Sequence, residues 1–315
     1  MASTASAANI GARSLSQGMI FMVLAMLMLP GIDALAKLVS GSVSAGQTAW
    51  ARFFFQIILL APAIVWQGGL SQSGLIFDRA LLFNRALWAH AARGFLIALA
   101  TLLFFAALKV MPLADAIAVF FVQPFIVTLL AALILGEAFG WRRMVAIAIG
   151  FGGALLIIKP SYEAFGLTAL LPVGTAISFA FYVILTRWLV QTASPLTMQF
   201  LAGVFGLITM TIALAFGNAY EVAVLTPTWP GTTEWQLLAL LGVIATTGHI
   251  LVVMAYSRAP VATLAPFQYL EIVSSATLGF LLFNDLPDLL TWVGIFIIVS
   301  SGMFVFYRER KQDQT

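Results

Sequence analysis

Long apolar segments joined by short connections constrain this chain more than any other feature. A helix needs roughly 20 predominantly apolar residues to cross the hydrocarbon core of a bilayer. Ten segments of about that length follow one another, and we therefore predict an all-α transmembrane protein of ten helices. Their predicted ranges are 18–39, 46–67, 88–110, 112–136, 141–158, 166–190, 195–217, 235–257, 260–283 and 289–307.

The composition excludes several other classes of protein. Of the 315 residues, 62% are hydrophobic and only 9% are charged, whereas soluble domains carry about 25% charged residues. The net charge of +3 is small and its basic residues are scattered, so no nucleic-acid partner is expected. Cysteine is absent, and the two histidines are far apart in the sequence. We therefore expect no disulfide, no metal and no cofactor.

Lysine and arginine are distributed unequally between the predicted connections. If the N-terminus is cytoplasmic, the opposite flanks hold only Lys37, Lys109 and Lys159. The cytoplasmic flanks then hold Arg13, Arg79, Arg85, Arg93, Arg142, Arg143, Arg187, Arg258, Arg308, Arg310 and Lys311. Because basic residues concentrate on the cytoplasmic side, both termini are predicted to be cytoplasmic. Residues 1–17 are small and polar and are predicted to be disordered, and 308–315 form a cytoplasmic tail.

The two halves of the chain repeat each other. Pro112–Glu137 aligns without a gap on Pro260–Asp285, at an offset of 148 residues, and Gln123 falls on Glu271. The same offset carries Gly18 to Gly166. An offset that holds along the chain indicates an internal duplication.

An odd number of helices in each repeat makes the second copy enter the membrane from the other side. The first repeat covers 18–160 and the second 161–307, each with five predicted helices. Inverted repeats of this kind occur in transporters, with the substrate site near the midplane where the repeats meet. Alternating access is therefore the predicted mechanism.

Several positions between Ala107 and Pro160 carry a family resemblance, and the second copy repeats it from Pro260 to Gly302. They are Pro112, Ala116, Pro124, Leu135-Gly136-Glu137, Gly150, Gly152, Gly153 and Ile157-Ile158. The chain resembles the EamA-type ten-helix transporters of the drug/metabolite transporter superfamily. The second copy departs from the pattern at Ile272 and at Asn284-Asp285.

The resemblance implies a function as well as a fold. Within the family, the chain looks most like bacterial exporters of amino acids and related metabolites, including the aromatic amino-acid exporter group. This implies a carrier in the bacterial inner membrane, surrounded by the lipid bilayer, that exports amino acids as a monomer or a homodimer. A multidrug or nucleotide-sugar carrier of the same superfamily is the alternative. A membrane-embedded enzyme is a distant one, because no paired acids, nucleophile with a base or metal-ligand cluster is apparent.

Glu271 is the strongest candidate for a functional residue in the pathway. It lies eleven residues past Pro260, which is about 16 Å along a helix and close to the middle of a core roughly 30 Å thick. Acids inside a bilayer are costly and usually serve a purpose. Gln123 has the same depth in the other repeat, and Gln268 and Tyr269 lie close by. These side chains predict a polar site in which Glu271 binds a cation or a proton.

Two further side chains are predicted beside this site. His249 lies deep in the eighth predicted helix, and Tyr182 is central in the sixth. Both have polar atoms that can line a pathway. The alternative is a structural role in which a partner such as His249 keeps a buried Glu271 neutral.

Charged residues also mark the two ends of the predicted bundle. At the outer end, Asp33, Lys37, Arg52 and Asp115 form either an open vestibule or a closed cluster that latches helix ends. Asp33 and Lys37 are four apart, a spacing that permits a pair along one helix, just after a Pro30-Gly31 bend. The inner end holds His90, Arg93 and Arg187. These three either line an inner mouth or extend toward the interface.

Overall fold

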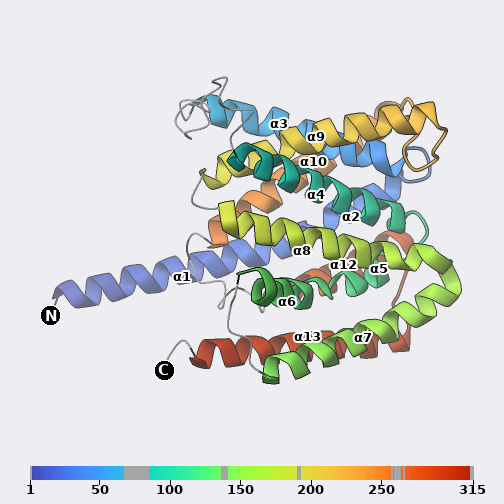
Figure 1. Ribbon diagram of the computed structural model, residues 1–315. Helices are drawn as coiled ribbons and strands as arrows, with labels where there is room; N and C mark the ends of the chain where they lie inside the picture. The colour runs from blue at the N-terminus through green and yellow to red at the C-terminus, as the bar shows by residue number, and fades with distance from the viewer. Residues whose placement is uncertain are drawn as a thin grey trace.

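The structure, a computed structural model, describes residues 2–66, 85–135, 141–189, 193–256, 258, 264 and 267–312. All regular structure in these residues is helical (Figure 1). The first group of helices is α1 (Ala2–Met28), α2 (Pro30–Val39), α3 (Ala45–Trp66), α4 (Arg85–Leu108), α5 (Leu113–Phe120), α6 (Gln123–Leu135) and α7 (Trp141–Phe165). The second group is the 3₁₀ helix η3 (Gly166–Leu170), α8 (Leu171–Leu189), α9 (Pro195–Ala219), α10 (Thr232–Tyr256), α12 (Leu270–Phe283) and α13 (Leu289–Gln312).

The helices have the length and composition needed to cross a membrane. Among the described residues, seven helical segments are long and apolar enough to do so, and two shorter apolar helices cover Leu270–Phe283 and Leu289–Phe304. One of the seven, Met144–Thr186, contains most of α7 and α8, separated by a turn in which Gly166 has φ of 61°. The prediction of an all-helical membrane protein is confirmed, and the count of ten helices stays a prediction.

The N-terminal segment differs from the sequence prediction. Helix α1 begins at Ala2, so residues 2–17 are helical rather than disordered. The segment contains several alanines, which have the highest helix propensity of any residue, and it continues directly into an apolar helix. The start of α1 and the end of α13 lie on the same side of the bundle (Figure 1).

Pro30 interrupts the first predicted span. Proline lacks a backbone N–H and clashes with the carbonyl four residues earlier, so α1 ends at Met28 and α2 begins at Pro30. Close to this break, the Ser274 hydroxyl of α12 donates to the Leu27 carbonyl at 3.1 Å. The predicted bend therefore exists, and a helix of the other repeat bonds to a carbonyl beside it.

A second pair of interruptions falls at repeat-related positions. The fourth predicted span is broken between α5 and α6 at Phe121, just before Pro124. In the ninth, Tyr269 is a turn residue and α12 begins after it. Phe121 and Tyr269 are 148 residues apart, and their rings contact with centroids 5.7 Å apart. Both helix breaks therefore meet where the two repeats meet.

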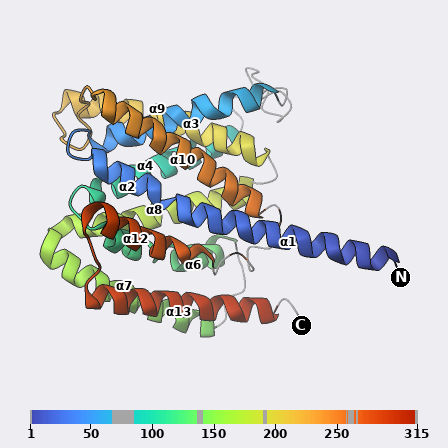
Figure 2. The same ribbon diagram turned by 180° about the vertical axis from the view of Figure 1, so that it is seen from behind.

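Repeat-related helices also pack in matching pairs. Helix α3 packs on α9, and α7 packs on α13; in each pair the helices occupy equivalent places in the two repeats (Figures 1 and 2). Helix α4 packs on α8, as its counterpart α10 packs on α1 and α2. Gly136, Glu137 and Pro260, which carry part of the sequence repeat, lie outside the described residues.

Small residues bring the α7–α13 pair close together. A Cβ atom built on Gly294 would lie 2.7 Å from the Gly153 carbonyl oxygen, so the two backbones touch. Ala146, Gly150 and Ala154, small residues spaced four apart on α7, are buried within the bundle, with Gly150 facing the Phe125 ring. Many apolar side chains elsewhere are exposed on the outside, among them Trp66 and Phe296. Such a surface suits a lipid environment.

Candidate functional site

Three charged side chains from both repeats lie close together inside the bundle. Asp33 belongs to α2 and Arg52 to α3, both in the first repeat, whereas Glu271 belongs to α12 in the second. The charge of Asp33 interacts with those of both Glu271 and Arg52. We refer to Asp33, Arg52 and Glu271 as the central charge group.

The two acids of the central charge group have no counter-charge in contact. Within the described residues, the single ion pair with N···O of 4.0 Å or less joins Lys37 to Asp285. Asp33 and Glu271 are both half-buried in the protein. Carboxylates in a low-dielectric environment require pairing, protonation or a ligand. Their arrangement therefore suits the binding of a cationic group or a proton.

Arg52 is anchored at one nitrogen and unsatisfied at another. Its side chain is 8% exposed, and Nη1 donates to the hydroxyl of Thr101 on α4. Thr101 in turn donates to the Ile97 carbonyl at 2.8 Å. The guanidinium lies 5.3 Å from the centre of the Phe53 ring, and its Nε is a buried donor without an acceptor in the described part of the chain.

His249 and Tyr182 lie within the electrostatic reach of Arg52. Nδ1 of His249 is 2.7 Å from the Ala245 carbonyl oxygen. Because a carbonyl only accepts, Nδ1 carries the proton in the neutral ring and Nε2 is left as an acceptor. No hydrogen bond joins His249 to Glu271 in the described residues. These two side chains extend the polar site from the central charge group toward α8 and α10.

The remaining predicted pathway residues lie at the helix breaks. The Tyr269 ring packs on Phe121, and a Cβ atom built on Gly302 would lie 1.6 Å from the Tyr269 hydroxyl. Tyr269 is therefore tightly enclosed between α5 and α13. Gln123 opens α6, and Gln268 lies just before α12; both are half-buried.

A second polar cluster lies at the end of the bundle away from the start of α1. We call it the far-end layer, and its charged members are Lys37, Asp115, Asp285 and Asp288. Lys37 Nζ lies 2.5 Å from Asp285 Oδ2, donates to the Met111 carbonyl at 2.9 Å and lies 4.8 Å from the Phe283 ring centre. Lys37 thus pairs with the second repeat and not with Asp33 one turn away. The fold brings the segment after α12 next to α2, which the spacing within one helix does not reveal.

Asp115 belongs to the far-end layer as well. It lies near Thr291 and interacts with the charges of Asp288 and Lys37, while its Oδ1 has no partner among the described residues. The sequence predicted Asp33, Lys37, Arg52 and Asp115 together at the outer end, as an open vestibule or a closed cluster. The structure divides them, because Asp33 and Arg52 lie with Glu271 in the central charge group.

The Arg93 side chain points into the bundle and connects three helices, and it does not extend toward the membrane–water interface. It is 3% exposed. Its Nε donates to Thr186 at 2.7 Å, Nη1 to the Met198 carbonyl at 2.6 Å and Nη2 to the Tyr182 hydroxyl at 2.8 Å. These bonds join α4 to α8 and α9. His90 is fully buried nearby, and the Arg187 side chain lies outside those described.

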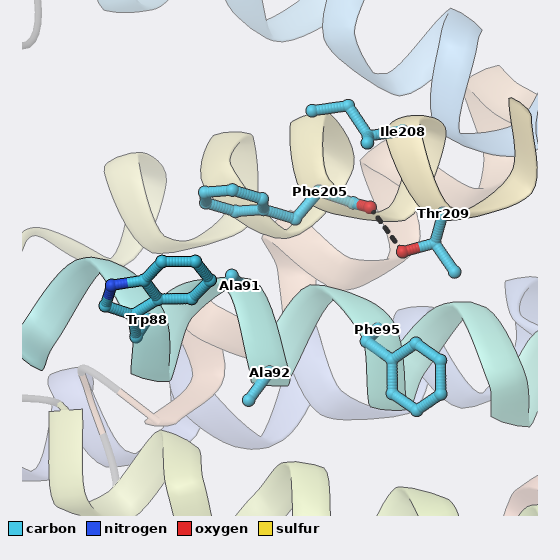
Figure 3. A pocket seen from close by; sticks show the side chains of 7 residues that line it. All are labelled: Trp88, Ala91, Ala92, Phe95, Phe205, Ile208 and Thr209. Atoms are coloured by element: carbon cyan, nitrogen blue, oxygen red, sulfur yellow. Dashed lines mark hydrogen bonds between the residues drawn. The ribbon is translucent and has the colours of Figure 1, made fainter. Parts of the chain in front are cut away.

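A groove of about 450 Å³ runs between α4 and α9 on the outside of the bundle (Figure 3). It is lined by Trp88, Ala91, Ala92, Phe95, Phe205, Ile208 and Thr209. The lining is apolar apart from the Thr209 hydroxyl, which is bonded to the Phe205 carbonyl at 2.8 Å. None of the predicted pathway residues lines this groove.

Comparison with known proteins supplies the family. The model of the EamA-like transporter family matches residues 16–159 and again residues 166–307. The chain belongs to the EamA-like transporter family. The two matches confirm the resemblance and the two EamA repeats predicted from the sequence.

Relatives of this EamA protein carry chemically different small molecules. An S-adenosylmethionine uptake transporter of Rickettsia prowazekii is 29% identical over 279 residues, 89% of this chain and 88% of the relative. A riboflavin transporter of Rhizobium johnstonii is 30% identical over 267 residues, covering 81% and 83%. A pseudopaline exporter of Pseudomonas aeruginosa is 28% identical over 291 residues, covering 90% and 94%.

The three relatives are all transporters of small molecules, which fits a membrane transporter of small metabolites. They also fit the prediction that the chain is not an enzyme. The narrower prediction of an aromatic amino-acid exporter stays a prediction. One solved crystal structure superposes on this chain with a TM-score of 0.63 at 17% identity, covering 94% of this chain and 99% of the other. This likeness concerns the fold alone.

Proposed function

We propose that this EamA protein is a secondary transporter that exports small polar metabolites, most of all amino acids, across the bacterial inner membrane by alternating access. The central charge group carries the proposal. It places two half-buried acids, which contact no counter-charge among the described residues, beside an arginine, and its members come from both repeats. A site shared between repeats changes its exposure when the repeats move relative to each other.

The proposed architecture has ten membrane crossings in two inverted five-helix repeats, with both termini in the cytoplasm. The helix breaks at Phe121 and Tyr269 support the repeat relation, since they fall at equivalent positions. The Met144–Thr186 segment supports the count of ten crossings, because this single apolar segment contains most of two helices, α7 and α8. The bias of basic residues supports the orientation.

Glu271 is proposed to bind the cationic group of the substrate, or a proton when the substrate is absent. The same carboxylate cannot hold both at once, so such a site exchanges one for the other. The named relatives include both uptake transporters and an exporter. The preference for export follows from the sequence resemblance. A nucleotide-sugar carrier is less favoured because Arg52 is the single cation of the central charge group.

Flux into and out of proteoliposomes tests the proposal. Purified protein is reconstituted, and labelled amino acids are offered on each side, with and without a pH gradient. We expect protein-dependent flux of at least one amino acid, strongly reduced in Glu271→Gln. If no amino acid moves while other polar metabolites do, the amino-acid assignment fails. If Glu271→Gln keeps the full rate and pH dependence, Glu271 is not the coupling acid.

A further inference from the structure

Arg52 has no assigned partner in the proposed exchange at Glu271, yet its side chain is 92% buried, as the complement of its 8% exposure. We propose that Arg52 binds a carboxylate of the transported molecule, so that the cargo bridges Arg52 of the first repeat and Glu271 of the second. The cargo class is then a metabolite with both a cationic group and a carboxylate. This inference rests on the proposed function and specifies the chemistry of the same site.

The hydrogen bonds of Arg52 indicate a fixed guanidinium with a donor left over. Nη1 is held by Thr101, whose hydroxyl is itself bound to the Ile97 carbonyl, and this chain fixes the position of the guanidinium against α4. Nε is buried and has no acceptor in the described residues. Buried polar groups are almost always satisfied, so a remaining donor marks a place for a ligand acceptor. A guanidinium binds carboxylates with directional, charge-assisted bonds.

The nearest acid does not occupy this role. Asp33 is close enough for its charge to act on Arg52, yet no N···O distance of 4.0 Å or less joins the two side chains. Asp33 therefore offsets part of the positive charge without satisfying Nε. The carboxylate of a bound cargo would accept from Arg52 Nε and complete the hydrogen bonding of the guanidinium. The cationic group of the same cargo would face the acids Asp33 and Glu271.

A bridging cargo explains why the charges belong to different repeats. Arg52 lies on α3 and Glu271 on α12. A molecule with only a cationic end would face the acids and leave Arg52 without an acceptor, and a molecule with only a carboxylate would leave Glu271 without a cation. A zwitterion links the two, so its binding favours the arrangement in which the repeats close around it.

The competing explanation is structural: Arg52 would serve only to tie α3 to Thr101 of α4. The two explanations differ in whether the effect of replacing Arg52 depends on the presence of a carboxylate in the cargo. A purely structural arginine affects all cargoes equally. An arginine that binds the carboxylate affects only cargoes that carry one.

The experiment measures binding to the full-length protein in nanodiscs and flux in proteoliposomes. The probes are the free amino acids, their C-terminal amides, which lose the carboxylate charge, and their N-acetyl forms, which lose the cation. The variants are Arg52→Gln and, as a matched control, Arg258→Gln. Arg258 donates to the Met254 carbonyl and packs on Phe21. It lies outside the central charge group.

We expect amidation to weaken binding about tenfold or more in the unaltered protein, in line with a lost charge-assisted bond. Arg52→Gln should weaken the free amino acid by a similar factor and leave the amide nearly unchanged, whereas Arg258→Gln should preserve the preference for the free acid. Arg52→Lys should restore part of it.

Equal binding of acids and amides, or an equal loss for both in Arg52→Gln, would overturn the inference. It is also overturned if no carboxylate-bearing probe binds. Flux of amides without flux of amino acids would reject the role of Arg52 while leaving a carrier of polar metabolites. Absence of flux for every probe would instead reject the proposed function as well.

Discussion

The central charge group and the far-end layer contain similar side chains in opposite states. In the far-end layer, Lys37 contacts Asp285 and donates to a backbone carbonyl, so its charge is paired and two of its three donors are used. In the central charge group, Asp33 and Glu271 contact no cation of the described part of the chain, and Arg52 keeps an Nε without an acceptor there. The comparison separates charges that hold helices together from charges left available for a cargo.

The cost of burial explains why this difference is informative. A buried ion is expensive unless a partner of opposite charge, hydrogen bonds or a ligand compensate for it. The Lys37–Asp285 pair of the far-end layer contains its compensation within the protein. The central charge group lacks contact partners in the described residues, and such unpaired groups inside a membrane protein mark ion or substrate pathways.

The largest expected effect comes from neutralising the central charge group. Glu271→Gln should lower amino-acid flux by about a hundredfold, as expected for loss of one charge-assisted contact worth roughly 2–3 kcal/mol. The fold should survive, because Glu271 makes no side-chain hydrogen bond or ion pair in the described structure. Flux in proteoliposomes and thermal unfolding in detergent measure the two quantities. A variant that unfolds early would assign Glu271 a structural role and break the comparison.

Breaking the far-end layer should have a smaller effect on flux and a clear effect on exposure. Lys37→Met leaves Asp285 without its partner, at an expected cost of about 1 kcal/mol for a half-buried pair. Because the chain has no cysteine, a single Ser40→Cys can be labelled by a membrane-impermeant maleimide. Labelling should be faster in Lys37→Met.

The charge-exchanged double variant is the control for this layer. Lys37→Asp combined with Asp285→Lys should slow maleimide labelling again, since the pair is restored in reverse. Equal labelling rates in all three backgrounds would show that the pair does not hold this end closed.

The packing of the second helix break is the next prediction. In Gly302→Ala the new Cβ would fall 1.6 Å from the Tyr269 hydroxyl, so the tyrosine ring must move away from α13. We expect a loss of about 1–3 kcal/mol, typical of overpacking, measured by unfolding in detergent micelles. Adding Tyr269→Phe should restore part of the loss, because the next atom of the ring lies at 2.8 Å. If Tyr269→Phe restores none of the stability, the loss in Gly302→Ala does not come from contact with the tyrosine hydroxyl.

The apolar groove should matter least for transport. Trp88 is 63% exposed and lines the groove outside the bundle. Trp88→Ala should change flux less than about twofold, since it removes no group from the central charge group and surface changes away from buried contacts cost little. Initial rates at several substrate concentrations measure this. A large loss would mean that the route passes between α4 and α9.

The sequence predicted much of the scaffold because its signals are local or periodic. Apolar segments of membrane length, the Pro30-Gly31 bend and the two repeats can all be recognised without coordinates. The breaks at Phe121 and Tyr269 were harder to anticipate. Pro124 signals the first, but its counterpart in the second repeat is Ile272, and the proline nearest the second break is Pro266, three residues before Tyr269.

The candidate site could be predicted only in part. Glu271 was recognised from its depth, and Arg52 gave a weaker signal of the same kind. Seven residues separate it from the start of α3 at Ala45, which is about 10 Å of helix and too deep for the end of the bundle. Its association with Asp33 and Glu271 depends on the angles at which α2, α3 and α12 pack.

By itself, the sequence determined that this chain folds as a helical membrane protein with two EamA repeats, because hydrophobic length and repetition are written along the chain. Only the tertiary structure decided which charges pair. Lys37 has a nearby acid on its own helix, yet it contacts Asp285, 248 positions away. The packing of helices across the repeats brings that distant carboxylate within reach of Lys37 and leaves Asp33 with Arg52 and Glu271.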